Sequence, residues 1–279
     1  MIKFKTETKF LNINSGVIME MRHPGVLRPH FAPIGVSGKL TERLPFTIRR
    51  VSNEADLWKA VRVRHAAYAR HVPDFARQLA HPEAADYGDD AIVFLAESKL
   101  DGAPLGTARM QTNLHEPLHV EESVTLPDWL RGEPLAEMSR LGVDNGRMGR
   151  LVKTALLKAG VMYCQQNDIA WALATGRAPI DRQYEQLTFV DVFPDLGFVP
   201  LRHVGNIPHR VMAFDITTIE ARWTAAQHPL LNFFCHIDHP DIDVSGRAGV
   251  RPPQPSAGRT IGSGLGVAQQ ASDRFELVA

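Results

Sequence analysis

The residues best suited to chemistry lie close together, at Glu137, Ser139 and Arg140, inside an otherwise apolar run over 134–143. This run has the composition of a buried strand, yet it delivers a carboxylate, a hydroxyl and a guanidinium within a few positions. Ionised side chains are costly in a protein interior unless they are paired or used. Because burial raises the pKa of a carboxyl, Glu137 is a candidate general base near neutral pH.

A helix start follows this strand directly. A helical pattern runs from Arg147 to about Gln166. Its start is marked by two glycines and two arginines, Gly146, Arg147, Gly149 and Arg150. Free backbone N–H groups and the positive end of the helix dipole suit such a start to an anion. The strand and the helix start together indicate a site for a phosphate-bearing substrate, and the alternative is a solvated helix turn.

The elements that must position these residues follow from hydrophobic periodicity and turn signals. We predict helices at 53–71, 147–166 and 179–187, and strands at 46–51, 91–96, 105–111, 135–143, 169–174, 198–201 and 210–214. The last two strands are expected to pair as a hairpin. This order favours an α/β fold, a mixed sheet with helices on both faces.

Alternation within the strand at 135–143 fixes which side chains share a face. Glu137 and Ser139 are expected on one face and Arg140 on the other, unless a bulge intervenes. We therefore assign Glu137 to chemistry and expect Arg140 mainly to hold the structure. The alternative is that Glu137 and Arg140 belong to a structural ion-pair network.

The composition of the 279 residues excludes several classes. The formal net charge is zero, which gives no indication of nucleic acid binding. Two cysteines, Cys164 and Cys235, provide neither a disulfide framework nor metal-ligand spacing, so we expect a cytoplasmic location and no metal site. We find no signal peptide and no apolar run long enough for a transmembrane helix.

Composition also suggests four segments. They are an irregular N-terminal arm (1–45), a main domain (46–216), a C-terminal extension packed on it (217–244) and a disordered, flexible tail (245–279) rich in Gly, Pro, Ser and Arg.

Four short motifs, in this order, resemble those of acyl-homoserine-lactone synthases and of their relatives, the long-chain N-acyl amino acid synthases of the GNAT acyltransferase fold. The resemblance covers roughly residues 46–215. The motifs run from Arg64 to Tyr68 on the first helix, Asp86 to Asp89 in the next loop, Gly106 to Arg109 on the third strand, and Glu137 to Arg140 on the fourth.

The sequence departs from the lactone synthases at two places. They usually carry a tryptophan a few residues after the helix aromatic, where this chain has Asp74 and Phe75. They also carry a glutamate two residues before the first loop aspartate, where this chain has Ala84, with Glu83 one place away. These departures favour the N-acyl amino acid synthases.

The resemblance implies a GNAT-like, mostly antiparallel sheet and an acyltransferase that moves a long-chain fatty acyl group to the amine of an amino acid or similar molecule. Acyl carrier protein or coenzyme A would be the thioester co-substrate, with no permanently bound cofactor. Acyl carrier protein and a small amine acceptor would be the partners. Glu137 and Ser139 would be catalytic, and a backbone N–H of the same strand would stabilise the oxyanion.

The remaining motif residues would bind the substrates. One set would bind the acceptor or order the cleft: Arg64, Tyr68, Asp86, Asp89, Arg109 and Arg140. A second set would bind the phosphopantetheine of the donor: Gly146, Arg147, Gly149 and Arg150. Three alternatives remain open: a lactone synthase, an acetyl-coenzyme A N-acetyltransferase, and a non-catalytic module that binds an acyl ligand.

Overall fold

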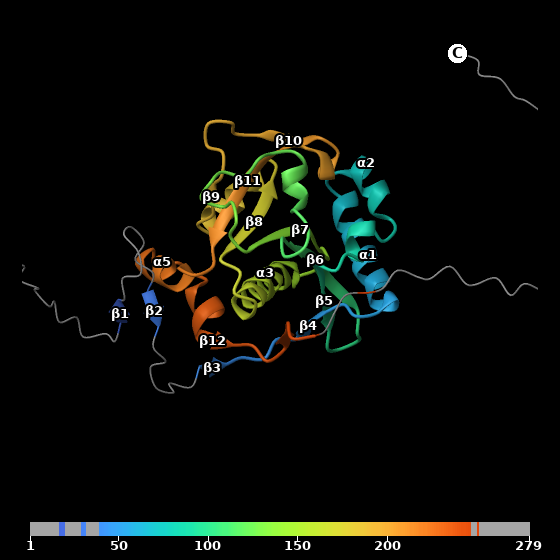
Figure 1. Ribbon diagram of the computed structural model, residues 1–279. Coiled ribbons are helices and arrows are strands. Elements are labelled where there is room, and N and C mark those ends of the chain that lie inside the picture. The colour runs from blue at the N-terminus through green and yellow to red at the C-terminus, as the bar shows by residue number, and fades with distance from the viewer. Residues whose placement is uncertain (1–16, 20–28, 32–38, 247–249, 251–279) are drawn as a thin grey trace, which may run out of the picture.

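A mixed central sheet organises the residues that the computed structural model describes, namely 17–19, 29–31, 39–246 and 250 (Figure 1). Its strands lie in the order β10 (Val199–Leu201), β11 (Ile207–Asp215), β8 (Trp171–Gly176), β7 (Leu135–Val143), β6 (Pro104–Thr112), β5 (Ala91–Ser98), β4 (Phe46–Arg50) and β13 (Ile242–Asp243), with β9 (Val190–Asp191) also paired to β11. Among the described strands of this sheet, only the β7–β8 and β4–β13 pairs are parallel. The predicted mixed, mostly antiparallel sheet is confirmed.

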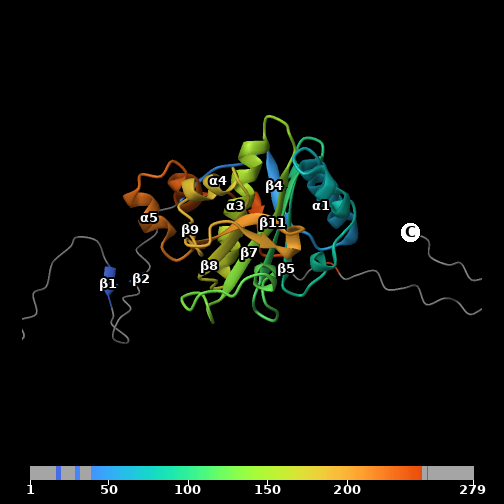
Figure 2. The ribbon, with the colours of Figure 1, turned by 90° about the horizontal axis from the view of Figure 1, so that it is seen from above.

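Helices cover both faces of this sheet (Figure 2). α1 (Glu54–Ala69) packs over β5, β6 and β7 on one face, and α3 (Gly149–Gln166) packs on the other. Shorter helices are α2 (Pro73–Ala76), α4 (Asp181–Gln186) and α5 (Ile219–Ala225). Two small pairings, β1 (Val17–Met19) with β2 (Pro29–Phe31) and β3 (Leu40–Thr41) with β12 (Ile237–Asp238), lie outside the central sheet. None of the helices in the described part of the chain is long and apolar enough to cross a membrane.

The sequence of α1 explains both its start and its buried face. Asn53 caps the helix, because its side-chain oxygen accepts the backbone N–H of Asp56 at 3.0 Å. Steps of four, three and four place Leu57, Val61, Arg64 and Tyr68 on one face of the helix, as the sequence predicts. The first three are buried and Tyr68 is half-buried. A guanidinium therefore enters the interior on an otherwise apolar face.

Small residues bring α3 close to the sheet. Ala155 and Ala159 of α3 face Ala108 of β6 and Ala136 of β7 in one buried cluster. The approach is tightest at Gly106, where an added Cβ would lie 2.6 Å from Val152 Cγ1. Close packing here fixes the helix that follows the bulged strand β7.

Most of the predicted elements are present, with shifted ends and additions. α3 begins at Gly149, two residues after the predicted start. The predicted loop at 72–90 contains α2 and two 3-10 turns, Arg77–Leu79 and Ala84–Asp86. The predicted hairpin is confirmed as β10–β11. The residues predicted as an irregular arm and a disordered tail lie largely outside the described residues.

Replacement of Gly106 by alanine tests the close approach of α3. We expect the Gly106→Ala variant to lose about 1–3 kcal/mol of unfolding free energy, because the new methyl meets Val152 and neighbouring core atoms. Urea unfolding monitored by circular dichroism measures this loss. Gly88→Ala is the control, since its nearest new contact would be an ordinary 3.8 Å. Equal stability of the two variants would show that the sheet yields easily at Gly106.

Candidate active site

A β-bulge interrupts β7 in the middle of the candidate motif. The register pairs Arg109 with Ser139 but Thr107 with Gly142, so β7 has one more residue than β6 between these pairs. The extra residue is Arg140, whose φ of 54° lies in the left-handed region. Its side chain is thereby turned to the α1 face, the face of Glu137. The prediction that Arg140 faces the opposite side from Glu137 is wrong, because strict alternation does not hold across a bulge.

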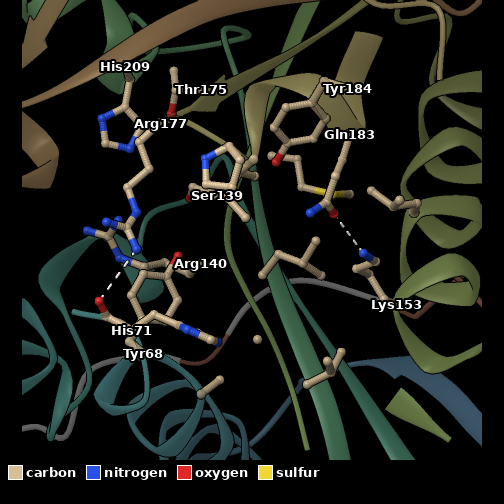
Figure 3. Close-up of a pocket in the computed structure, with 18 of the residues that line it drawn as sticks. Tyr68, His71, Ser139, Arg140, Lys153, Thr175, Arg177, Gln183, Tyr184 and His209 are labelled. Atoms are coloured by element: carbon tan, nitrogen blue, oxygen red, sulfur yellow. Dashed lines mark hydrogen bonds between the residues drawn. The ribbon is translucent and has the colours of Figure 1, made fainter. Parts of the chain in front are cut away.

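A large cavity opens where β7 and β8 separate. The two strands pair only from Leu135–Trp171 to Met138–Ala174, and β7 then continues through the bulge without a β8 partner. The cavity has a volume of about 1140 Å³ and is lined by residues of α1, β7, α3, α4 and the segments near 203–209 and 228–230. Figure 3 shows Tyr68, Ser139, Lys153 and Tyr184 around this hollow, each from a different element.

Three arginines and two carboxylates form a buried cluster beside the cavity. Arg64 binds both oxygens of Asp86 at 2.9 and 2.8 Å. Arg109 donates to Asp86 and to Glu83, both at 3.1 Å. Arg140 binds both oxygens of Glu83 at 2.7 Å. The structure thus brings together one residue or more from each of the four motifs.

The cluster has one more cation than anion, and this shapes its electrostatics. Burial alone would raise the pKa of the Glu83 carboxyl, but the hydrogen bond from Arg140 and the nearby Arg109 and Arg64 hold that pKa below its ordinary value. The Asp86 pKa is likewise lowered, against the effect of burial, by Arg64 and Arg109. Both carboxyls are therefore ionised at neutral pH, and the cluster keeps a net positive charge on the side where Arg140 lines the cavity.

Glu137 lies behind the cavity rather than on its wall. Its side chain is buried at 1% exposure, and its Oε2 accepts the backbone N–H of Val120 at 3.0 Å. Its Oε1 is 3.4 Å from Nε2 of His203, which does line the cavity. Burial raises the Glu137 pKa to about 7, although the Val120 N–H, Arg109 and Arg140 oppose that rise. Ser139 lines the cavity itself.

Of the other residues predicted to bind the acceptor, Tyr68 lies at the cavity and Asp89 does not. Tyr68 lines the cavity, with its ring centroid 6.0 Å from that of Phe75. Phe75 also lies under the Arg140 guanidinium, at 5.2 Å from the ring centroid. Asp89 is exposed in a turn and makes no hydrogen bond or ion pair with the described residues. The structure therefore separates the two aspartates of the loop motif.

The predicted phosphate-binding residues are only partly gathered at the cavity. Of the four, Arg150 lines it, and Gly146 and Arg147 lie in the exposed turn before α3. Gly149 allows that turn to fold back, because an added Cβ would lie 2.6 Å from the Asp144 carbonyl oxygen. Two further cations line the wall. Lys153 was expected from the sequence on a basic rim with Arg147 and Arg150, whereas sequence reasoning missed Arg177.

Glu83 and His203 are the most important site residues that sequence reasoning did not assign. Glu83 is one residue from the motif position, and it reaches the arginines because a 3-10 turn at 84–86 follows it. Its backbone N–H donates to Asp86 at 2.8 Å, which locks the two carboxylates together. His203 comes from the distant 3-10 turn Arg202–Val204, and no spacing in the sequence links it to Glu137.

Comparisons with known proteins give structural likenesses alone. No family model and no curated protein matches the chain. It is similar to FeeM, an N-acyl amino acid synthase from uncultured soil microbes, at 16% identity over 65% of this chain and 96% of that one, with a TM-score of 0.48. It is similar to BjaI, a CoA-dependent acyl-homoserine lactone synthase solved with SAM and isopentyl-CoA. The identity is 18% over 72% of this chain and 94% of that one, and the TM-score is again 0.48. It is similar to the ribosomal-protein-S18-alanine N-acetyltransferase of Escherichia coli at 18% identity over 61% of this chain and 94% of that one, with a TM-score of 0.42.

The two loop aspartates provide a matched test of the ion cluster. We expect Asp86→Asn to lower the unfolding free energy by about 3–5 kcal/mol, because it leaves buried guanidiniums without their carboxylate. Asp89→Asn should change it by less than about 0.5 kcal/mol, as is usual for an exposed position. Chemical denaturation of both variants measures the difference, and a small effect at Asp86 would contradict a structural role for the cluster.

Proposed function

We propose that this chain is an N-acyltransferase that moves a long-chain fatty acyl group from the thioester of acyl carrier protein to the amine of an amino acid or similar small molecule. The observation that carries the proposal is the cavity at the bulge of β7. On that side β7 has no β8 partner beyond Met138, so an extended ligand could pair with the edge that β8 leaves uncovered. An extended donor arm can add to such an edge as a strand does.

The size and lining of the cavity support a long acyl group. Its volume of about 1140 Å³ exceeds the range of about 300–1,000 Å³ that is usual for small-molecule sites. Leu141, Leu157, Leu187 and Leu230 contribute apolar surface to its wall. An acetyl group alone would leave most of this surface without a partner.

Basic residues at the cavity support an anionic donor. Arg150, Lys153 and Arg177 all line it, and Lys153 donates to Gln183 Oε1 at 2.9 Å (Figure 3). Guanidinium and ammonium groups bind phosphate oxygens well. They would also favour association with an acidic carrier protein, and such electrostatic attraction acts mainly on the rate of association.

The excess positive charge of the arginine cluster supports an acceptor that carries a carboxylate. Arg140 presents this charge at the cavity, beside Ser139 and Tyr68. An amino acid has the required combination, since its carboxylate would pair with the cluster while its amine faces the thioester.

The chemistry requires one base and one oxyanion donor. The amine loses a proton and attacks the thioester carbonyl, the new C–N bond forms, and the C–S bond breaks as the thiolate leaves and takes up a proton. Glu137 is the proposed proton acceptor, because burial places its pKa at about 7. A backbone N–H at the bulge is the proposed oxyanion donor.

A donor competition tests the proposed activity. Purified protein is given an amino acid mixture with long-chain acyl carrier protein, long-chain acyl-coenzyme A and acetyl-coenzyme A, and N-acyl products are identified by mass spectrometry. We expect the long-chain carrier-protein thioester to react fastest. Faster turnover of acetyl-coenzyme A would replace the proposal with an acetyltransferase, and no product from any donor would favour a binding module.

Substitution of Glu137 tests the proposed base. We expect kcat to rise as pH increases through about 7, because the carboxyl accepts a proton only after it is deprotonated. Glu137→Gln should remove this rise and lower kcat by about 10²–10⁴-fold. Glu220→Gln is the matched control, since this exposed carboxyl lies outside the cavity wall. Undiminished turnover in Glu137→Gln would remove Glu137 from the mechanism.

A further inference from the structure

The position of Glu137 leaves a gap in the path of the proton. Its carboxyl has almost no exposed surface and does not line the cavity in which an acceptor amine would bind. A general base must reach the proton directly or through an intermediate group. The residue that stands between Glu137 and the cavity is His203. Its Nε2 is 3.4 Å from Glu137 Oε1, and the residue lines the cavity although its side chain is only 5% exposed.

Three atoms at this junction lack hydrogen-bond partners among the described residues. They are Oε1 of Glu137 and both ring nitrogens of His203, and all three are buried. A neutral imidazole has one N–H donor and one acceptor nitrogen, and each requires a partner when it is buried. A slight closure of the 3.4 Å separation would join Nε2–H to the carboxylate. Nδ1 would then remain as the acceptor. Because Nδ1 is itself covered in this structure, a small movement of the cavity wall that His203 lines must expose it to the bound amine.

We propose that His203 relays the proton from the acceptor amine to Glu137. Nδ1 accepts the proton that the amine loses as it attacks the thioester, and the Nε2 proton passes to Oε1 of Glu137. The amine nitrogen gains the C–N bond, the thiolate leaves as the C–S bond breaks, and the ring ends in its other neutral tautomer. This inference rests on the proposed acyl transfer and makes His203 the catalytic residue that touches the substrate.

The surroundings of His203 explain why the proton does not stay on the ring. Arg140 from β7 donates to the His203 carbonyl oxygen at 3.1 Å. The ring centroids of His119 and His203 are 6.0 Å apart. Burial, followed by Arg140, His119, His209 and Arg109, lowers the His203 pKa to about 3. An imidazolium is therefore strongly disfavoured at this position.

The surroundings of Glu137 favour its role as the final acceptor. It is faced by the Val120 N–H, Arg109, Arg140, Glu122 and His203, and its pKa of about 7 lies far above that of the ring. The neutral acid is therefore accessible at neutral pH. A proton that enters at Nδ1 is passed on, and the cationic form of the ring is only transient.

The first test reads the tautomer of the resting protein and needs no turnover. Long-range proton–nitrogen correlation spectra of ¹⁵N-histidine-labelled protein at pH 8 assign the tautomer of each ring, with His203→Gln used to identify its signals. We expect neutral His203 with its proton on Nε2. A proton on Nδ1 would overturn the relay, because that nitrogen could not then accept one from the amine.

The second test is kinetic and uses a double-mutant cycle. We expect His203→Gln to lower kcat by about 10²–10⁴-fold with little change in KM, and to lose the rise in kcat near pH 7. The double variant with Glu137→Gln should be no slower than either single variant, because the two residues act as one unit. His236→Gln is the matched control, because this exposed histidine lies outside the cavity and contacts Asn232 and Glu220, and it should keep near-normal kcat.

The outcomes separate the relay from the proposed function. An active wild type whose His203→Gln variant keeps full kcat and the normal pH profile would overturn the relay alone. Additive losses in the double variant would also overturn it. A wild type without acyl transfer from any donor would remove the proposed function, and the relay with it.

Discussion

The double hydrogen bond between Arg140 and Glu83 is the interaction on which the site depends. Arg140 has a left-handed backbone, which costs a non-glycine residue about 1–3 kcal/mol where the surroundings impose it. Two charge-assisted bonds of 2.7 Å to Glu83 hold the side chain in this orientation. The bulge and the cation at the cavity wall both occur at this residue, two positions after the last β7–β8 pair.

The same ion pairs connect α1 and the turn after α2 to two strands of the sheet, which no backbone ladder does. Arg64 belongs to α1, Arg109 to β6 and Arg140 to β7, while both carboxylates come from the turn after α2. Buried ion pairs of this kind add little net stability compared with apolar packing, and they are demanding in geometry. Their contribution here is to fix the position of a helix and a loop against two strands.

Part of this arrangement could be predicted from the sequence, and part of it could not. The apolar run around Glu137 predicted its burial, and the helical stripe predicted that Arg64 enters the interior. Alternation failed at Arg140 because no glycine or turn residue marks the bulge. Glu83 was set aside because motif spacing assumes a fixed loop conformation, whereas a 3-10 turn determines which carboxylate reaches the arginines. His203 lies 66 positions after Glu137, and only the tertiary fold brings the two together.

The parallel pairing of β13 with β4 has a consequence for how the chain folds. Ile242 pairs with Ile48, and the nearby Asp241 carboxylate accepts the backbone N–H of Leu44 at 2.8 Å. The edge of the first strand of the central sheet is thus covered by one of the last strands to be made. During synthesis β4 would remain an open edge until residue 243 is available, and open edges invite pairing with other chains.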